Sequence, residues 1–129
     1  MVTNSELDER FIARQKDRLQ NLREELLRIR TGMSADERQR AENEGDTQLD
    51  SGDMSQDMFT RELDATIGQQ VELRLKDVDR ALQKIEEGTY GICDDTGEPI
   101  PKGRLEAIPE AIRTVEAQQR YERERRPPL

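Results

Sequence analysis

The chain of 129 residues has no histidine, no tryptophan, four aromatic side chains and a single cysteine, Cys93. Without histidine there is no imidazole to act as a general base or to bind a metal. One cysteine excludes an internal disulfide and a four-cysteine zinc site. No apolar run approaches the roughly 18 residues that a membrane-spanning helix needs, and the N-terminus lacks a signal-peptide core. We therefore expect a cytoplasmic protein with no membrane contact.

Charge is abundant but unevenly distributed. Charged residues make up 39% of the chain against 32% hydrophobic, and the net charge is −8. Between residues 34 and 64 there are ten acidic and three basic residues, which accounts for nearly all of the net charge. Free nucleic acid is an unfavourable partner for such a chain, because cationic contacts to phosphate supply most of that affinity. The acidic segment is either a solvated loop or a surface that meets a basic partner or a bound metal ion.

Two stretches carry apolar side chains at the spacing of a coiled-coil seam. The first is predicted to be a helix from about residue 5 to residue 31, started by a capping box at Thr3–Glu6 and broken by Gly32. A second capping box at Ser34–Glu37 predicts a short helix to about residue 43. The first seam consists of Ile12, Gln15, Leu19, Leu22, Leu26, Ile29 and Met33.

The second stretch is predicted to be a helix that begins at Asp53, after a polar loop at residues 44–53, and ends before Gly88. Two long amphipathic helices with a polar connection most simply form an antiparallel hairpin. Its seam consists of Phe59, Leu63, Ile67, Val71, Leu75, Val78, Leu82 and Ile85. The rest of the chain begins with glycine- and proline-rich turns, and Pro109 is predicted to open a last helix that carries Ile112, Val115 and Tyr121.

Three segments then carry a resemblance: Ile85–Cys93, Thr96–Ile100 and Arg104–Pro109. In their order and spacing they resemble the DksA/TraR family of bacterial transcription regulators, over about residues 53–123. The resemblance implies a mainly α protein, with a long antiparallel coiled-coil hairpin at residues 4–88 and an acidic tip at about 44–55. It also implies a small zinc-finger-like domain with a C-terminal helix at residues 89–126.

The family's usual zinc knuckle has two pairs of cysteines, and the resemblance places these positions at Cys93, Thr96, Thr114 and Ala117. Because threonine and alanine do not replace thiolates as zinc ligands, the chain is similar to the zinc-free branch and we expect no metal or other cofactor. Cys93 is then either a small buried residue or a redox-sensing thiol. The side chains expected to pack in place of the metal are Tyr90, Ile92, Ile100, Leu105, Ile108, Ile112 and Val115.

The resemblance further implies a non-enzymatic regulator, linked to stress, that binds RNA polymerase through its secondary channel and modulates initiation without contacting nucleic acid itself. The tip positions that would contact polymerase are Asp50, Asp53 and Ser55, although Asp53 also suits a helix start. The basic positions of the family's guanosine-tetraphosphate site correspond to Asp77, Ile108 and Gln118, none of which is basic. The alternative is a stress-linked coiled-coil interaction or structural protein, such as a weak homodimer, that has lost the polymerase role.

Overall fold

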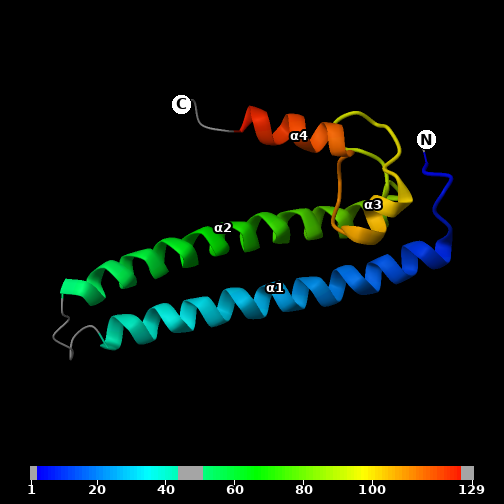
Figure 1. Ribbon diagram of the computed structural model, residues 1–129. Coiled ribbons are helices and arrows are strands. Elements are labelled where there is room, and N and C mark those ends of the chain that lie inside the picture. Colours follow the sequence, from blue (N-terminus) through cyan, green and yellow to red (C-terminus); the bar gives the residue numbers. More distant parts are fainter. Residues whose placement is uncertain (1–2, 44–50, 126–129) are drawn as a thin grey trace. The chain divides into compact units, whose positions relative to one another are not determined.

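The computed structural model describes the backbone of residues 3–43 and 51–125, and the side chains of residues 3–32 and 65–125. Four helices follow one another in this part of the chain, and the described residues form no strand beyond one isolated β-bridge (Figure 1). None of the described helices combines the length and apolarity needed to cross a membrane. The mainly α fold class predicted from the sequence is confirmed.

The first helix, α1, spans Glu9–Asn43 and runs through Gly32 without a break. The prediction that Gly32 ends this helix and that a separate short helix follows is therefore wrong. A glycine inside a helix costs only about 1 kcal/mol relative to alanine, which the helix-forming residues on both sides can offset. Nothing lies within 4 Å of the place where a Gly32 Cβ would be, so no close approach imposes a turn there.

The start of α1 also differs from the prediction. Asp8 caps the helix, because its Oδ1 accepts a hydrogen bond from the Phe11 amide at 2.7 Å. The predicted cap at Thr3–Glu6 is wrong, since Asn4 Oδ1 accepts the Glu6 amide at 3.1 Å and holds a turn there instead. The capping-box pattern at residues 3–6 therefore does not start the helix, because Asn4 within it makes the other contacts described below.

The second helix, α2, spans Ser51–Glu87 and so begins two residues before the predicted Asp53. The rest of the predicted loop, residues 44–50, lies outside the described residues. The predicted end at Gly88 is confirmed: this glycine has φ 81°, and its amide donates to Ile85 O at 3.3 Å while the Thr89 amide donates to Lys84 O at 2.8 Å. This pair of bonds is the Schellman motif, in which a left-handed residue satisfies the last helical carbonyls.

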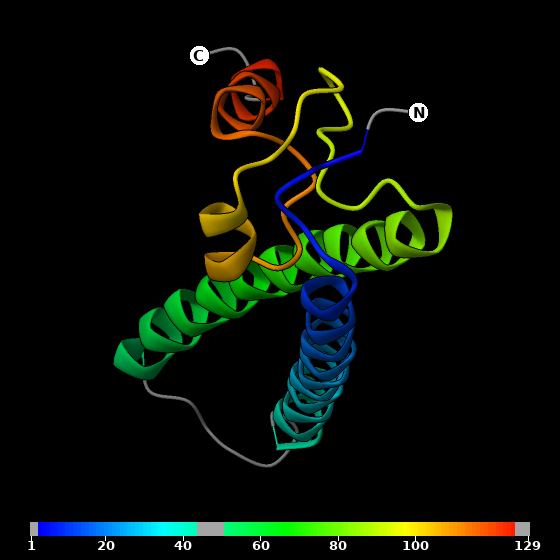
Figure 2. The same cartoon turned by 90° about the vertical axis from the view of Figure 1, so that its right-hand side faces the viewer.

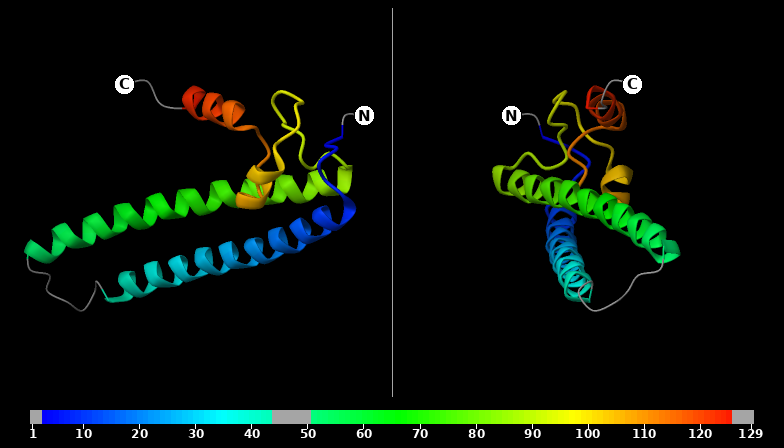
Figure 3. Two further views of the ribbon diagram at one scale, coloured as in Figure 1. Left: turned by 45° about the vertical axis from the view of Figure 1, so that its right-hand side comes forward. Right: turned by 90° about the vertical axis from the view of Figure 1, so that its left-hand side faces the viewer.

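The chain divides into two compact units, one made of Met1–Arg23 with Lys76–Leu129 and the other of Glu24–Leu75. In each unit a segment of α1 lies antiparallel to a segment of α2 (Figures 1 and 3). In the second unit Leu26 of α1 is buried with Val71 and Leu75 of α2, and Arg30 Nη1 meets Glu72 Oε1 at 3.2 Å. The division into domains at residue 88 stays a prediction.

In the first unit the seam of α1 and α2 is buried at Leu19, Val78 and Ala81. Arg23 Nε meets Asp79 Oδ1 at 2.7 Å beside it. Of the predicted seam positions, Ile29 and Ile67 in the other unit are exposed. Met33, Phe59 and Leu63 lie outside the residues whose side chains are described.

Beyond α2 the first unit contains a turn-rich segment, the short helix α3 (Lys102–Ala107) and the last helix α4 (Val115–Glu124) (Figure 2). The turn segment folds back on itself through an antiparallel bridge between Ile92 and Pro99. Five of the seven side chains expected to form this core are buried, whereas Ile108 and Val115 are 38% and 44% exposed. The prediction for those two residues is wrong.

The last helix begins six residues later than the predicted Pro109. Thr114 is its N-cap and its Oγ1 accepts the Ala117 amide at 3.2 Å. A proline suits the first turn of a helix, but a threonine that caps with its side chain is the stronger local signal here. Because Val115 is therefore the first residue of α4, it does not lie on the helix face that the Pro109 start implied.

Candidate functional site

The four positions that correspond to zinc ligands lie in one small region of the first unit. Cys93 sits in a tight turn, where its amide donates to Glu98 O at 2.8 Å and its carbonyl accepts the Gly97 amide at 2.9 Å. Gly97 has φ 74°, which a residue with a Cβ adopts only at a cost. The thiol is 2% exposed and forms no disulfide.

Hydrogen bonds surround the Cys93 sulfur. Burial by itself raises the pKa of this thiol, but hydrogen bonds from the Thr96 side chain and from the amides of Thr114, Thr96 and Asp95 outweigh burial and lower it. The groups that lower the pKa of this thiol thus include two of the other three knuckle positions, Thr96 and Thr114. The fourth, Ala117, is buried and linked to them through the Thr114 hydroxyl.

These residues do not fit a zinc ion. Tetrahedral zinc needs four nitrogen, sulfur or carboxylate ligands, and here one thiol is present while Ala117 has no ligand atom. The Thr114 hydroxyl caps α4, and the Thr96 hydroxyl accepts the Glu98 amide at 3.3 Å. Among residues 3–32 and 65–125, whose side chains the structure describes, no group of three or more cysteine, aspartate or glutamate side chains is arranged to hold a metal.

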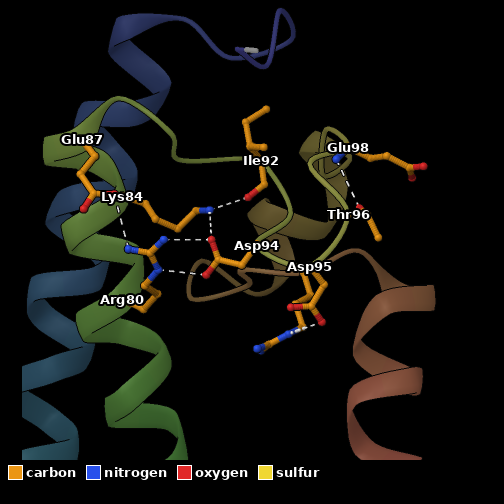
Figure 4. A network of polar contacts seen from close by, with 9 residues as sticks. Arg80, Lys84, Glu87, Ile92, Asp94, Asp95, Thr96 and Glu98 are labelled. Carbon is orange, nitrogen blue, oxygen red and sulfur yellow. Dashed lines mark hydrogen bonds and ion pairs between the residues drawn. The ribbon is translucent and has the colours of Figure 1, made fainter. Parts of the chain in front are cut away.

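A network of charged side chains joins this turn to α2 (Figure 4). Lys84 of α2 is 2% exposed, and its Nζ donates to Ile92 O at 2.6 Å and to Asp94 Oδ1 at 2.5 Å. Arg80, one helical turn earlier, contacts both oxygens of Asp94, at 2.9 and 3.1 Å. Burial raises the pKa of the Asp94 carboxyl, but the hydrogen bonds from Arg80 and Lys84 outweigh it and lower the pKa.

The N-terminal segment is also tied to the turn region. Asn4 is buried, and its Nδ2 donates to Gly91 O at 3.0 Å and to Ile100 O at 2.8 Å. Glu6 Oε2 accepts the Lys102 amide at 3.2 Å, and the Lys102 ammonium lies 5.1 Å from the centre of the Phe11 ring. Residues 4–6 therefore form a strap across the turn region, which the pattern of residues 3–6 did not indicate.

Gln15, the polar interruption in the first seam, has a structural reason. It is buried, and its Nε2 donates to Tyr90 OH at 3.0 Å and to Leu105 O at 2.7 Å. The Tyr90 hydroxyl in turn donates to Pro109 O at 2.8 Å, and burial raises the pKa of Tyr90. One glutamine thus connects α1 to three segments that follow α2.

At the end of α4 a tyrosine ring stacks against guanidinium groups. Arg113 and Arg125 lie 3.8 and 4.2 Å from the centre of the Tyr121 ring. Arg113 Nε also meets Asp95 Oδ2 at 2.9 Å. These contacts link α4 to the turn that holds Cys93.

The three positions that correspond to the family's guanosine-tetraphosphate site have separate surroundings. Burial raises the pKa of Asp77, the charge of Arg113 lowers it and that of Glu110 raises it, and the result is a raised pKa. Ile108 is partly exposed, and Gln118 Nε2 donates to Glu122 Oε1 at 3.1 Å. Nothing in the described contacts brings these three residues together.

The predicted tip lies largely outside the described structure. Asp50 lies outside the described residues altogether. Asp53 and Ser55 belong to the first turns of α2, but their side chains lie outside the described ones. Their role stays a prediction.

The knuckle region matches a family model described as "Prokaryotic dksA/traR C4-type zinc finger" over residues 88–123. Among curated proteins, the chain is 48% identical over 64 residues to the "RNA polymerase-binding transcription factor DksA" of Caulobacter vibrioides, a match that covers 43% of this chain and 45% of that protein. It is 61% identical over 44 residues to "General stress protein 16O" of Bacillus subtilis, which covers 34% of this chain and 27% of that one. These matches span less than half the length of either relative.

Solved structures are similar over most of the chain. Transcription factor DksA2 from Pseudomonas aeruginosa is 30% identical with a TM-score of 0.67, and the match covers 92% of this chain and 89% of that one. The RNA polymerase binding protein and transcriptional regulator Dks from Chlamydia trachomatis is 32% identical with a TM-score of 0.50, over 91% of this chain and 93% of that one. The similarity therefore extends beyond the knuckle to the two long helices.

Proposed function

Since the chain belongs to the DksA/TraR family of transcription regulators, we propose that it binds RNA polymerase through the secondary channel and modulates initiation with the acidic tip of its hairpin. The observation that carries this proposal is the 30% identity to transcription factor DksA2 over 92% of the chain. The protein acts in the cytoplasm as a binding partner of polymerase, without catalysing a reaction or binding nucleic acid itself.

The charge distribution supports the tip mechanism. Ten acidic residues lie between residues 34 and 64, a segment that includes the end of α1, the connection and the start of α2. Carboxylates presented in a confined, basic or magnesium-containing channel act strongly, because the local dielectric is low. Asp50 and Asp53, with Ser55 beside them, are the residues that carry the effect in this proposal.

The test is transcription in vitro with the cognate polymerase, comparing the wild type with Asp50→Asn plus Asp53→Asn. The control is Glu86→Gln plus Glu98→Gln, which removes the same amount of charge from exposed positions in the other unit. We expect the tip variant to bind polymerase but to lose its effect on transcription, while the control retains both. A tip variant with wild-type activity, or a wild type that does not bind at micromolar concentration, would refute the proposal.

We also propose that this function requires no zinc and no guanosine tetraphosphate. The zinc part rests on the donor set of Cys93, Thr96, Thr114 and Ala117, which lacks three ligands. The nucleotide part rests on the acidic or uncharged character of Asp77, Ile108 and Gln118. Adding guanosine tetraphosphate to the transcription assay should leave the effect of the protein unchanged.

A coiled-coil interaction protein that forms a homodimer is the second candidate. The observation in its favour is that Ile29, Ile67 and Leu73 are exposed in the unit Glu24–Leu75. Sedimentation equilibrium distinguishes the two candidates, because this one requires a mass that rises with protein concentration. A monomer at all concentrations, combined with polymerase binding, excludes it.

A further inference from the structure

The turn that carries Cys93 must be held on α2 by something other than a metal. In a four-ligand knuckle, one ion connects the turn to the helix that follows it. Here a single thiol remains, and hydrogen bonds from Thr96 and from nearby amides surround it. This leaves open which contacts hold the segment Ile92–Asp94 in place.

The Lys84 ammonium is a buried positive charge that contacts this segment. It is 2% exposed, and an unpaired charge at such a depth is strongly unfavourable. Its Nζ donates to two acceptors in the turn, Ile92 O at 2.6 Å and Asp94 Oδ1 at 2.5 Å. If the turn leaves α2, the ammonium therefore loses both of these acceptors in one step.

Arg80 strengthens the same connection from the neighbouring helical turn. Its Nε and Nη2 donate to the two carboxylate oxygens of Asp94 at 2.9 and 3.1 Å, a bidentate pair of fixed geometry (Figure 4). Its Nη1 also meets Glu87 Oε2 at 3.4 Å, which orients the guanidinium along α2. One carboxylate thus accepts three hydrogen bonds from two cations.

We propose that this ionic joint of Lys84, Arg80 and Asp94 is the crosslink that holds the Cys93 turn on α2. The joint differs from a zinc site in what it connects. It links the turn backwards to the preceding long helix, whereas the hydrogen bonds of Cys93 and Thr114 link it forwards to α4. In this arrangement Lys84 and Asp94 hold the Cys93 turn in place relative to α2.

Cys93 supplies a direct measurement of the joint. It is the only cysteine in the chain and its side chain is buried, so a thiol reagent reacts only when the turn opens. The rate of reaction with an uncharged aromatic disulfide, compared with the rate in denaturant, therefore reports the population of open turn in the intact protein.

The main variant is Lys84→Met, which keeps the length of the side chain and removes its charge. We expect labelling of Cys93 to become about 100-fold faster, because the turn loses the two charge-assisted hydrogen bonds from the ammonium to Ile92 O and Asp94 Oδ1. Loss of a nearby positive charge by itself makes the thiolate less abundant and the reaction slower. A faster rate therefore reports opening rather than a change in intrinsic reactivity.

Lys76→Met is the matched control, since it is the same substitution at an exposed position of the same helix, and it should label at the wild-type rate. If Lys84→Met also loses helical circular dichroism, Asp94→Asn decides, because that residue lies on the turn and its change leaves α2 intact. The double variant should label more slowly than independent effects of the two changes predict. Wild-type labelling in both single variants, or independent effects in the double variant, would overturn the proposal.

Discussion

Replacing Gly91 with alanine should show how closely the N-terminal strap approaches the turn region. Gly91 has φ 88°, in the left-handed region that favours glycine. A Cβ added there would lie 2.5 Å from Leu7 Cδ1, 3.1 Å from Asn4 Nδ2 and 3.3 Å from Asn4 Cβ. The Leu7 side chain is flexible at this atom and can rotate away. Asn4 is held in place by its two hydrogen bonds to carbonyls.

The expected loss of stability has two parts. Left-handed backbone with a Cβ costs about 1–2 kcal/mol. Displacing the Asn4 amide from Gly91 O and Ile100 O loses two buried hydrogen bonds at about 1 kcal/mol each. We therefore expect the free energy of unfolding to fall by about 3–4 kcal/mol, which corresponds to a decrease in Tm of roughly 10 °C.

Gly97→Ala is the matched control, because its φ is 74° and nothing lies within 4 Å of the added Cβ. It should lose only the backbone part, about 1–2 kcal/mol. Urea denaturation followed by circular dichroism measures both. Equal losses for Gly91→Ala and Gly97→Ala would refute the strap as a close contact. Asn4→Ala should add little in the Gly91→Ala background, because the same hydrogen bonds are already lost.

The remaining predictions concern the buried polar groups. Gln15→Leu should destabilise the protein by about 1–3 kcal/mol in thermal unfolding, because Leu105 O and the Tyr90 hydroxyl lose their partner. A chelator should leave Tm unchanged; a fall in Tm reversed by zinc would contradict the absence of a zinc site. The pKa of Asp94 is lowered from 3.8 in the folded protein. The stability that its carboxylate contributes is therefore fully present above pH 3.8 and is lost as the pH falls through the lowered pKa. Asp94→Asn should accordingly make the free energy of unfolding depend less on pH in the acidic range. The raised pKa of Asp77 has the opposite effect, because a carboxyl whose pKa is higher in the folded state destabilises the fold when it is ionised. Asp77→Asn should therefore raise Tm at neutral pH, which scanning calorimetry can measure.

The long helices and the end of α2 were predictable because their signals are local. Apolar side chains at steps of three and four residues indicate a buried helical face wherever they occur. Gly88 follows the last seam residues at the position where a left-handed residue completes the hydrogen bonds of the helix end. The segments Ile85–Cys93 and Arg104–Pro109 likewise pointed to the family whose model matches residues 88–123, and the four ligand positions stay a prediction from that resemblance.

The errors arose where a local preference competed with contacts from elsewhere. Gly32 lowers helix propensity, yet α1 continues through it. The capping pattern at Thr3–Glu6 is not used because Asn4 binds carbonyls at Gly91 and Ile100, about 90 residues away in the chain. Val115 looked like a core residue by type, but the N-cap at Thr114 makes it the first residue of α4 and so places it on a different helix face. Ile108, the C-cap residue of α3, is also partly exposed.

By itself, the sequence determined the fold class and the family of the chain. These properties depend on residue type and spacing along the chain. Only the tertiary structure decided what holds the knuckle together, because Lys84, Arg80 and Asp94 are ordinary charged residues until folding buries one of them against a turn. The same applies to Asn4 and Gln15. The stability of a buried polar group depends on partners that are distant in sequence, and no local pattern specifies those partners.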